Sequence, residues 1–155
     1  MSADKNLEEL GYTLPPAPKA VGVYKPAILV GNLCYTSGHV PLLPDGNMIK
    51  GCVGKDADEK AGYEAAKQAG LTILATLKNH FGSLDKIKRV VKIFGLVNCS
   101  DDFSGQPAVM NGCSELMKAV FGDDNGVGAR SAVGTNSLPL GVMVEIEAIF
   151  EIKEG

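Results

Sequence analysis

The segment from Gly128 to Phe150 constrains the fold of this chain more than any other stretch. Two apolar runs flank a turn at Leu138 to Gly141, and this pattern predicts a β-hairpin. In the second run, residues 142–150, successive side chains alternate between the two faces of a strand. One face is entirely apolar, which is typical of a core face. The other carries two carboxylates between large apolar residues, so a second surface or a pocket is expected to cover it.

The two carboxylates belong to Glu145 and Glu147, which a strand would place about 6.6 Å apart. Two acids in an apolar setting require a nearby cation or a shared proton. Arg130 opens the first run of the predicted hairpin and is the candidate cation. Two interpretations follow from the residues. The group is either a surface ion pair worth under about 1 kcal/mol or part of a covered functional site.

The overall composition indicates one globular domain that can bury a sizeable core. The chain has 155 residues, of which 45% are hydrophobic, and its net charge is −3. This charge does not favour a broad surface for nucleic acid or anionic lipid. No run of about 18 apolar residues predicts a membrane span. The polar, acidic N-terminus lacks a signal-peptide core, so a cytoplasmic location is expected.

The cysteines and histidines give no metal signature. The four cysteines never form a C-x-x-C pair, and His39 and His80 are far apart in the sequence. We therefore expect no metal site and free thiols. For His39 the residues leave two readings, a pH-sensitive pocket residue or a structural histidine satisfied by neighbours.

The chain divides into an extended N-terminal lead-in over residues 1–19, with a short helix near Lys5 to Leu10, and one domain over residues 20–155. Prolines at positions 15, 16 and 18 require extended geometry there. The first part of the domain is rich in apolar and β-branched runs, with a Gly-Asn turn signal between two of them. Strands are predicted over Ala20 to Tyr24, Ala27 to Val30, Leu33 to Ser37 and Met48 to Val53.

A long amphipathic helix follows, with Asp56 as its N-cap and Glu59 completing a capping box. Apolar residues recur at helical spacing as far as Phe81. Gly62 and Gly70 each cost about 1 kcal/mol of helix propensity relative to alanine, which a close approach of helix to sheet would explain.

The remaining elements predict an α+β fold. A strand over Ile87 to Asn98 and a second helix over Gln106 to Phe121 precede the predicted hairpin. Two helices on one face of a mixed sheet leave the other face bare. Because a bare apolar sheet face is unstable in water, we expect self-association through it.

Several short motifs, weak singly but specific in their order, extend from Ala20 to the C-terminus. Together they resemble the Rid superfamily, the reactive intermediate deaminases, also called the YjgF family. They are Ala20-Val-Gly-Val-Tyr24, Tyr35-Thr-Ser-Gly38 with Val40-Pro41, an alanine-rich first helix, Asn111, Arg130-Ser-Ala-Val and Val144-Glu-Ile-Glu-Ala-Ile.

The resemblance implies a chorismate-mutase-like α+β fold and a homotrimer whose sheets form a central barrel, with clefts between subunits. Active members of the superfamily hydrolyse enamine or imine intermediates, such as 2-aminoacrylate, to 2-keto acids and ammonia without a cofactor. The implied ligand is a small imino acid or carboxylate. Other members are named endoribonucleases, translation inhibitors or chaperones.

The resemblance also assigns roles to residues of this chain. Arg130 would hold the substrate carboxylate with its fork of donors. Glu145 would accept a proton from the attacking water. Tyr24 would close the pocket, and Gly38 would let the backbone approach the substrate. Asn111 would orient a loop or the ligand.

Two positions depart from the common pattern of the superfamily. Ala132 stands where many deaminating members have cysteine or threonine, and His39 stands where relatives often have glutamine. The loop from Phe103 to Asn111 is also longer. Alternatives to deamination are therefore capture of a small carboxylate without turnover, or a protein-interaction or chaperone-like role. RNA cleavage is disfavoured by the acidic charge balance.

Overall fold

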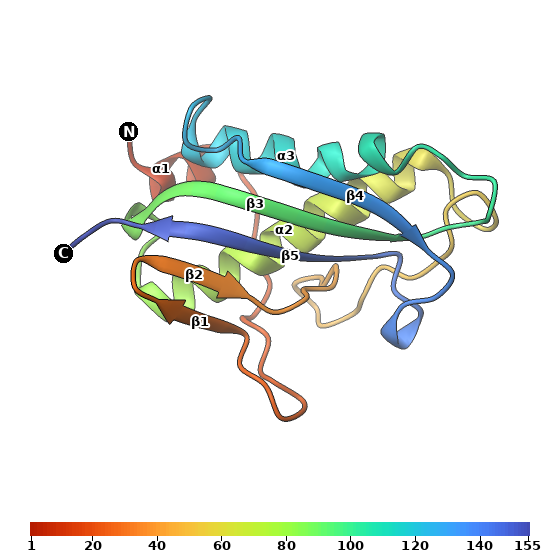
Figure 1. The fold of residues 1–155 in the computed structure, drawn as a ribbon, viewed down its shortest axis with the longest axis horizontal. Coiled ribbons are helices and arrows are strands. Elements are labelled where there is room, and N and C mark those ends of the chain that lie inside the picture. The colour runs from red at the N-terminus through yellow and green to blue at the C-terminus, as the bar shows by residue number, and fades with distance from the viewer.

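Five strands form one mixed sheet in the order β1-β2-β5-β3-β4, and two long helices cover one of its faces (Figure 1). This computed structural model describes residues 1–155. The strands are β1 Ala27–Val30, β2 Leu33–Thr36, β3 Ile87–Asn98, β4 Ala129–Thr135 and β5 Val144–Ile152. The helices are α1 Ala3–Glu9, α2 Glu59–Phe81 and α3 Gln106–Phe121, with 3-10 turns η1 Leu84–Lys86 and η2 Pro139–Gly141. The predicted α+β class with a mixed sheet is confirmed, and α1 adds a third helix.

The predicted hairpin between residues 128 and 150 is wrong, because β3 lies between β4 and β5. Strand β4 pairs only with β3, in parallel, and β5 pairs with β3 and β2, antiparallel to both. The chain from β3 returns through α3 before entering β4, and such a helical crossover joins parallel neighbours. The turn after β4 then carries the chain across β3 to reach β5. Two apolar runs separated by a turn do not by themselves define which strands pair.

Helix α2 begins two residues later than predicted, with Asp58 rather than Asp56 as its N-cap. The Asp58 carboxylate accepts a hydrogen bond from the Ala61 amide at 2.8 Å. Asp56 instead accepts one from the Cys52 amide and organises the preceding loop. Gly82 ends the helix in the left-handed region, with a φ of 80°.

The small residues of α2 face α3 rather than the sheet, which corrects the expected helix–sheet approach. A Cβ on Gly62 would lie 2.8 Å from a methyl group of Val109, and one on Gly70 would lie 2.9 Å from a methyl group of Leu116. On the α3 side, a Cβ on Gly112 would lie only 2.0 Å from the backbone carbonyl oxygen of Tyr63. These glycines therefore allow the two helix backbones to come close.

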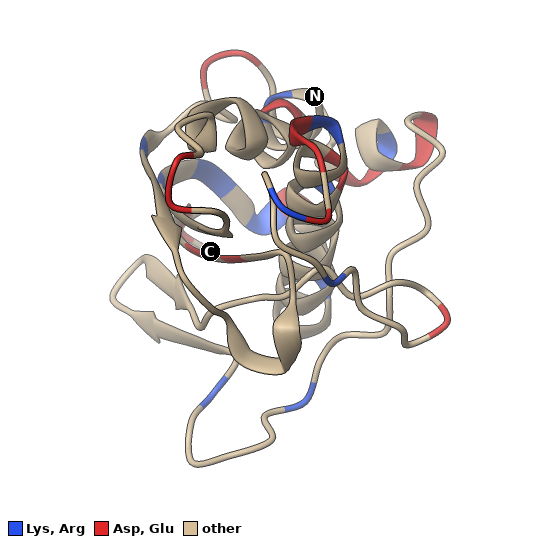
Figure 2. Cartoon of the chain, turned by 90° about the vertical axis from the view of Figure 1, so that its right-hand side faces the viewer, with Lys and Arg blue, Asp and Glu red and all other residues tan.

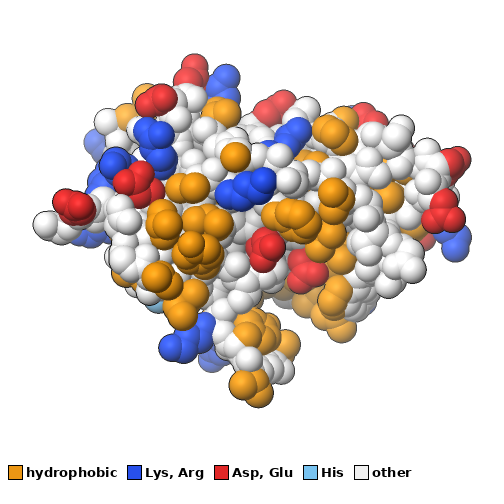
Figure 3. Space-filling model, in the orientation of Figure 1, with side chains coloured by type: hydrophobic (Ala, Val, Ile, Leu, Met, Phe, Trp, Pro, Cys, Tyr) orange, Lys and Arg blue, Asp and Glu red, His pale blue; other side chains and the backbone are white.

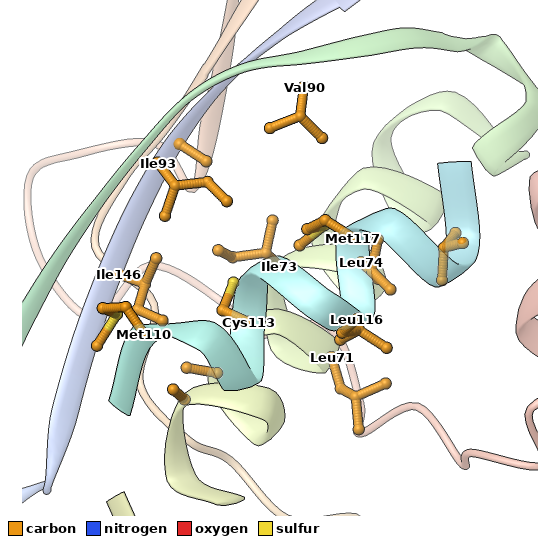
Figure 4. Packing of buried hydrophobic residues seen from close by; sticks show 14 of the residues in the cluster. Leu71, Ile73, Leu74, Val90, Ile93, Met110, Cys113, Leu116, Met117 and Ile146 are labelled. Atoms are coloured by element: carbon orange, nitrogen blue, oxygen red, sulfur yellow. The ribbon is translucent and has the colours of Figure 1, made fainter. Parts of the chain in front are cut away.

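The core lies between this helix pair and the inner face of the sheet (Figure 4). The inner face comes from alternate residues of β3 and β5, as their period of two requires. Ile93 and Ile146 project from it toward Met110, Ile73 and the neighbouring helix residues (Figure 4). The predicted core face of the last strand is thus confirmed.

Two predicted strands are not present as such, whereas the short helix predicted near Lys5 to Leu10 is present as α1. Residues 20–24 form bends, and residues 48–53 form isolated bridges, including one from Lys50 to Val142. Each segment contains a glycine, Gly22 or Gly51, and glycine weakens the interior of a strand. In the lead-in, α1 packs Ala3 and Leu7 into the core, and the chain is extended only from residue 12 onward.

The outer face of the sheet is open and partly apolar (Figures 1 and 3). Exposed apolar side chains occupy it from one edge to the other, with acidic groups between them (Figure 3). They come from Ile28 and Val30 of β1, Tyr35 of β2 and Val133 of β4. So many exposed apolar side chains on one face are typical of a surface that another chain covers.

Candidate functional site

A cavity of about 620 Å³ lies beside the open face, between the chain of residues 18–26, the turn before β5 and β5 itself. Tyr24, Gly38 and Glu145 all line it. The structure therefore brings together three of the five residues singled out from the sequence, although Glu145 is more than 100 positions from the other two.

Gly38 is held against β5 by the segment that follows β2. The amide of His39 donates to the carbonyl of Ile146 at 2.7 Å, and the Ile146 amide donates to the carbonyl of His39 at 2.9 Å. This bridge aligns Gly38 with Glu145, the neighbour of Ile146. A Cβ on Gly38 would lie 2.5 Å from Oε1 of Glu145, so only glycine leaves room for the carboxylate in this position.

Gly38→Ala is expected to displace the Glu145 carboxylate and to lower any activity of the site by about 100-fold, because a shift near 1 Å in a reacting group has effects of that size. Gly155→Ala is the control for an added methyl group, since its Cβ would meet no atom within 4 Å and Gly155 does not have a positive φ. Kinetics and melting curves of both variants test this. Full activity in Gly38→Ala would contradict it.

Glu145 is a half-buried carboxylate without a partner in the chain. No hydrogen bond or ion pair within the chain reaches its oxygens. Burial raises the pKa of Glu145 above its usual range, and the negative charge of Glu147 raises it further. A raised pKa makes the ionised carboxylate a stronger base, which favours its taking a proton from water.

The loop of residues 18–26 projects from the fold (Figure 1), and its residue Tyr24 lines the cavity. Its side chain is half exposed, and its hydroxyl accepts a 3.4 Å hydrogen bond from the Val21 amide. The loop also contributes Lys19, a basic residue that lines the cavity opposite the two acids. Sequence reasoning missed Lys19, because nothing in the chain marks a lysine between a proline and an alanine as a pocket residue.

Leu140 is a second lining residue that the sequence did not indicate. It lies in η2, is exposed, and has a φ of 60°, which is unusual for leucine. The predicted turn at residues 138–141 is present, but as the wall of the cavity rather than as the tip of a hairpin.

Arg130 and Asn111 lie together, away from the cavity. The Arg130 Nη1 donates to Oδ1 of Asn111 at 2.8 Å and to Oγ of Ser114 at 3.2 Å, both on α3. No carboxylate of the chain pairs with this guanidinium. We call these three residues the arginine cluster. A guanidinium without a carboxylate partner in the chain can bind an external carboxylate with its remaining N–H donors.

Arg130 and Glu145 face opposite sides of the sheet, which corrects the expectation that they neighbour each other on adjacent strands. Both strands pair with β3, where Arg130 is opposite Ile93 and Glu145 is opposite Leu96. Residues three apart on one strand point in opposite directions. Within one chain, the two groups therefore cannot act on the same small molecule.

Small residues occupy the sheet beside the arginine cluster. Ala132 is paired with Gly95 in β3, and the Met110 sulfur lies 2.1 Å from where a Cβ of Gly95 would be. Met110 thus occupies space that larger residues on β3 would need. Cys113 lies next to the cluster on α3, but burial raises the pKa of its thiol to about 12 against the opposing charge of Arg130, so it stays protonated.

Basic and acidic residues are interspersed along the backbone of this fold (Figure 2). Basic segments are spread over the cartoon and alternate with acidic ones (Figure 2). No group of three histidine, cysteine or acidic side chains is arranged to hold a metal ion. None of the helices has the length and apolar content needed to cross a lipid bilayer.

Comparison with known proteins identifies relatives along nearly the whole chain. The family described as YjgF/chorismate mutase-like, putative endoribonuclease, matches residues 4–151. Protein TCP17 of Trypanosoma cruzi is 36% identical over 147 residues, which cover 95% of this chain and 92% of that protein. A 2-iminobutanoate/2-iminopropanoate deaminase of Dermatophagoides farinae is 30% identical over 140 residues, 90% of this chain and 93% of the deaminase.

A solved structure supports the same assignment. The crystal structure of Atu1372 from Agrobacterium tumefaciens, a protein described as of unknown function, is 40% identical and superposes with a TM-score of 0.89. The match covers 98% of this chain and 94% of that one. With sequence, fold and family match in agreement, the chain belongs to the YjgF/chorismate mutase-like family, also called the Rid family.

Proposed function

We propose that this protein hydrolyses small 2-imino acids, or the enamines that tautomerise to them, to 2-keto acids and ammonia, in sites shared between two copies of the chain. The observation that carries this proposal is the unpartnered, half-buried carboxylate of Glu145 over Gly38. Membership of a family that includes 2-iminobutanoate deaminases supports it.

The separation of the two predicted halves of the site supports a shared cleft. One half consists of Tyr24, Gly38 and Glu145, and the other is the arginine cluster. Strand β4, which carries Arg130, is the last strand of the sheet, so its outer edge is available to another chain. An assembly that covers the open apolar face would bring the arginine cluster of one copy to the cavity of the next.

The proposed reaction uses the chain's own residues for binding and proton transfer. Arg130 of one copy binds the carboxylate of the imino acid. Glu145 of the other takes a proton from a water molecule, whose oxygen bonds to the imine carbon, and the proton passes to the nitrogen. Glu145 takes the hydroxyl proton of the resulting carbinolamine and gives it to the nitrogen, the carbon–nitrogen bond breaks as the carbonyl forms, and ammonia leaves. Glu145 returns to its starting state, and the 2-keto acid remains.

The assay generates imino acids in place with an amino-acid oxidase and catalase, and follows their capture by semicarbazide. An active deaminase should lower semicarbazone formation from the imine by releasing the keto acid first. Wild-type protein that leaves the imine signal unchanged across several amino acids would reject hydrolysis. Binding of 2-oxobutanoate by such an inactive protein would instead favour the non-catalytic carboxylate-binding role.

Mixing two inactive variants tests whether the site is shared. Arg130→Ala chains keep Glu145, and Glu145→Gln chains keep Arg130. If each site takes one residue from each of two copies, randomly mixed assemblies regain about a quarter of the intact sites. Unfolding the two variants together and refolding them should therefore restore about a quarter of wild-type activity. No recovery, with mixed assemblies verified by mass spectrometry, would contradict a site that combines Arg130 of one copy with Glu145 of another.

The assembly itself is expected to be a homotrimer. Light scattering should give about three times the 16.2 kDa mass of one chain. Val30→Lys introduces a charge on the apolar open face and should shift the mass toward one chain, whereas Lys60→Ala, on the helix side, should not. A wild-type mass of 16.2 kDa at micromolar concentration would contradict both the trimer and the shared cleft.

A further inference from the structure

His39 is almost fully buried at the floor of the cavity, where its side chain is only 3% exposed. Both ring nitrogens nevertheless have partners. Nδ1 lies 2.6 Å from the carbonyl oxygen of Ser37, and Nε2 lies 2.8 Å from Oγ1 of Thr76 on α2. The ring therefore connects the segment that follows β2 to the helix layer beneath it.

These contacts define the protonation of the ring. A carbonyl oxygen only accepts hydrogen bonds, so Nδ1 must carry a proton. Burial lowers the pKa of His39, although the hydrogen bond to Ser37 opposes this, and the ring is neutral at pH 7. Nε2 then holds a lone pair and accepts the hydroxyl proton of Thr76. Neutral histidine in water favours a proton on Nε2, so this site selects the less common tautomer.

Ser37 connects His39 to the loop that carries Tyr24. Its amide donates to the carbonyl of Pro26 at 2.9 Å, and its hydroxyl donates to the carbonyl of Lys25 at 2.5 Å. Both acceptors end the loop that carries Tyr24. The Ser37 carbonyl belongs to the peptide that joins Ser37 to Gly38, so a bond to this oxygen fixes the plane of that peptide.

We propose that His39 is a positioning residue whose neutral, Nδ1-protonated ring holds the Ser37–Gly38 peptide in place under the Glu145 carboxylate. The backbone bridge to Ile146 holds Gly38 from one side, and the ring, braced on Thr76, holds it from the other. His39 exchanges no proton with the substrate. The kinetic part of this inference rests on the proposed deaminase function, whereas the tautomer and the geometry of Gly38 rest on this chain alone.

Two substitutions separate the two ring contacts. The amide nitrogen of asparagine lies at the same distance along the side chain as Nδ1, so His39→Asn can keep the bond to Ser37 and lose Thr76. The amide of glutamine reaches the level of Nε2, so His39→Gln can keep Thr76 and lose Ser37. Each variant loses one buried hydrogen bond, which makes the pair matched in stability.

The expected results differ between the two variants. His39→Asn should keep the amide resonance of Gly38 near its wild-type position and kcat within about 3-fold of wild type. His39→Gln should move that resonance and lower kcat by about 10-fold or more, because the peptide under Glu145 is no longer held. If His39 only supported the fold, both substitutions would change the melting temperature by the same amount. Neither the Gly38 resonance nor kcat would then differ between the two variants.

Nitrogen NMR of histidine-labelled wild-type protein tests the tautomer directly. The chain has two histidines, and His80 is exposed on α2, so it supplies an internal reference. A proton on Nδ1 and a lone pair on Nε2 are expected for His39 at pH 7. A ring protonated on Nε2, or equal Gly38 shifts in the two variants, would overturn the inference. An inactive wild type with the expected tautomer and Gly38 shifts would reject the deaminase function and leave the positioning role standing.

Discussion

Glu145→Gln is expected to lower the turnover of 2-imino acids by 100-fold or more, the usual contribution of a general base. Glutamine has nearly the same size and fits over Gly38, but it cannot take a proton from water. Melting temperature and binding of 2-oxobutanoate should stay near wild type, since neither depends on the lost proton transfer. Kinetics, calorimetry and thermal melts of the same preparation check this.

Glu147→Gln and Glu8→Gln are the controls for this substitution. Glu147 contributes to the raised pKa of Glu145, so Glu147→Gln should retain turnover and move the acidic limb of the pH–rate profile to lower pH. The sign follows because the base must be ionised to act, and removal of a neighbouring negative charge eases its ionisation. Glu8 is exposed on α1, and its substitution should change nothing. Glu145→Gln with wild-type kcat would remove Glu145 from the mechanism.

Gly112→Ala is expected to destabilise the fold by about 3 kcal/mol. The added methyl group would be forced against the backbone carbonyl of Tyr63 and, at 3.1 Å, the backbone nitrogen of Lys67. Backbone atoms cannot turn aside, so α2 and α3 would have to separate. For a chain of this length the loss corresponds to roughly 10 °C in melting temperature.

Gly70→Ala is the matched control for the same pair of helices. Its added methyl group would meet the end of the Leu116 side chain at 2.9 Å and the Cys113 sulfur at 3.2 Å, and a side chain can change rotamer. Alanine also gains about 1 kcal/mol in helix propensity over glycine, which offsets part of the crowding. We expect a change within about 1 kcal/mol, measured by denaturant unfolding. Equal losses of unfolding free energy in the two variants would show that contact with backbone atoms at Gly112 costs no more than contact with side chains at Gly70.

Local patterns in the sequence were sufficient for the elements themselves. The Gly31-Asn32 pair defines the β1-β2 hairpin, whose register joins Val30 to Leu33. The apolar stripe of α2 and the alternation in β5 gave the buried faces correctly. The Asp56 N-cap was wrong because two aspartates fit the same signal, and only the path of the preceding loop decides which one reaches a helix amide.

For the site, the sequence determined the residue types and the tertiary structure decided their grouping. A short motif ties Gly38 to β2, and another ties Glu145 to β5, and their meeting in one cavity follows once β2 and β5 pair. The face of the sheet on which Arg130 lies could not be predicted from such local motifs. Its face depends on β4 pairing with β3 instead of β5, and strand pairing is a non-local choice that alternation within a strand does not encode.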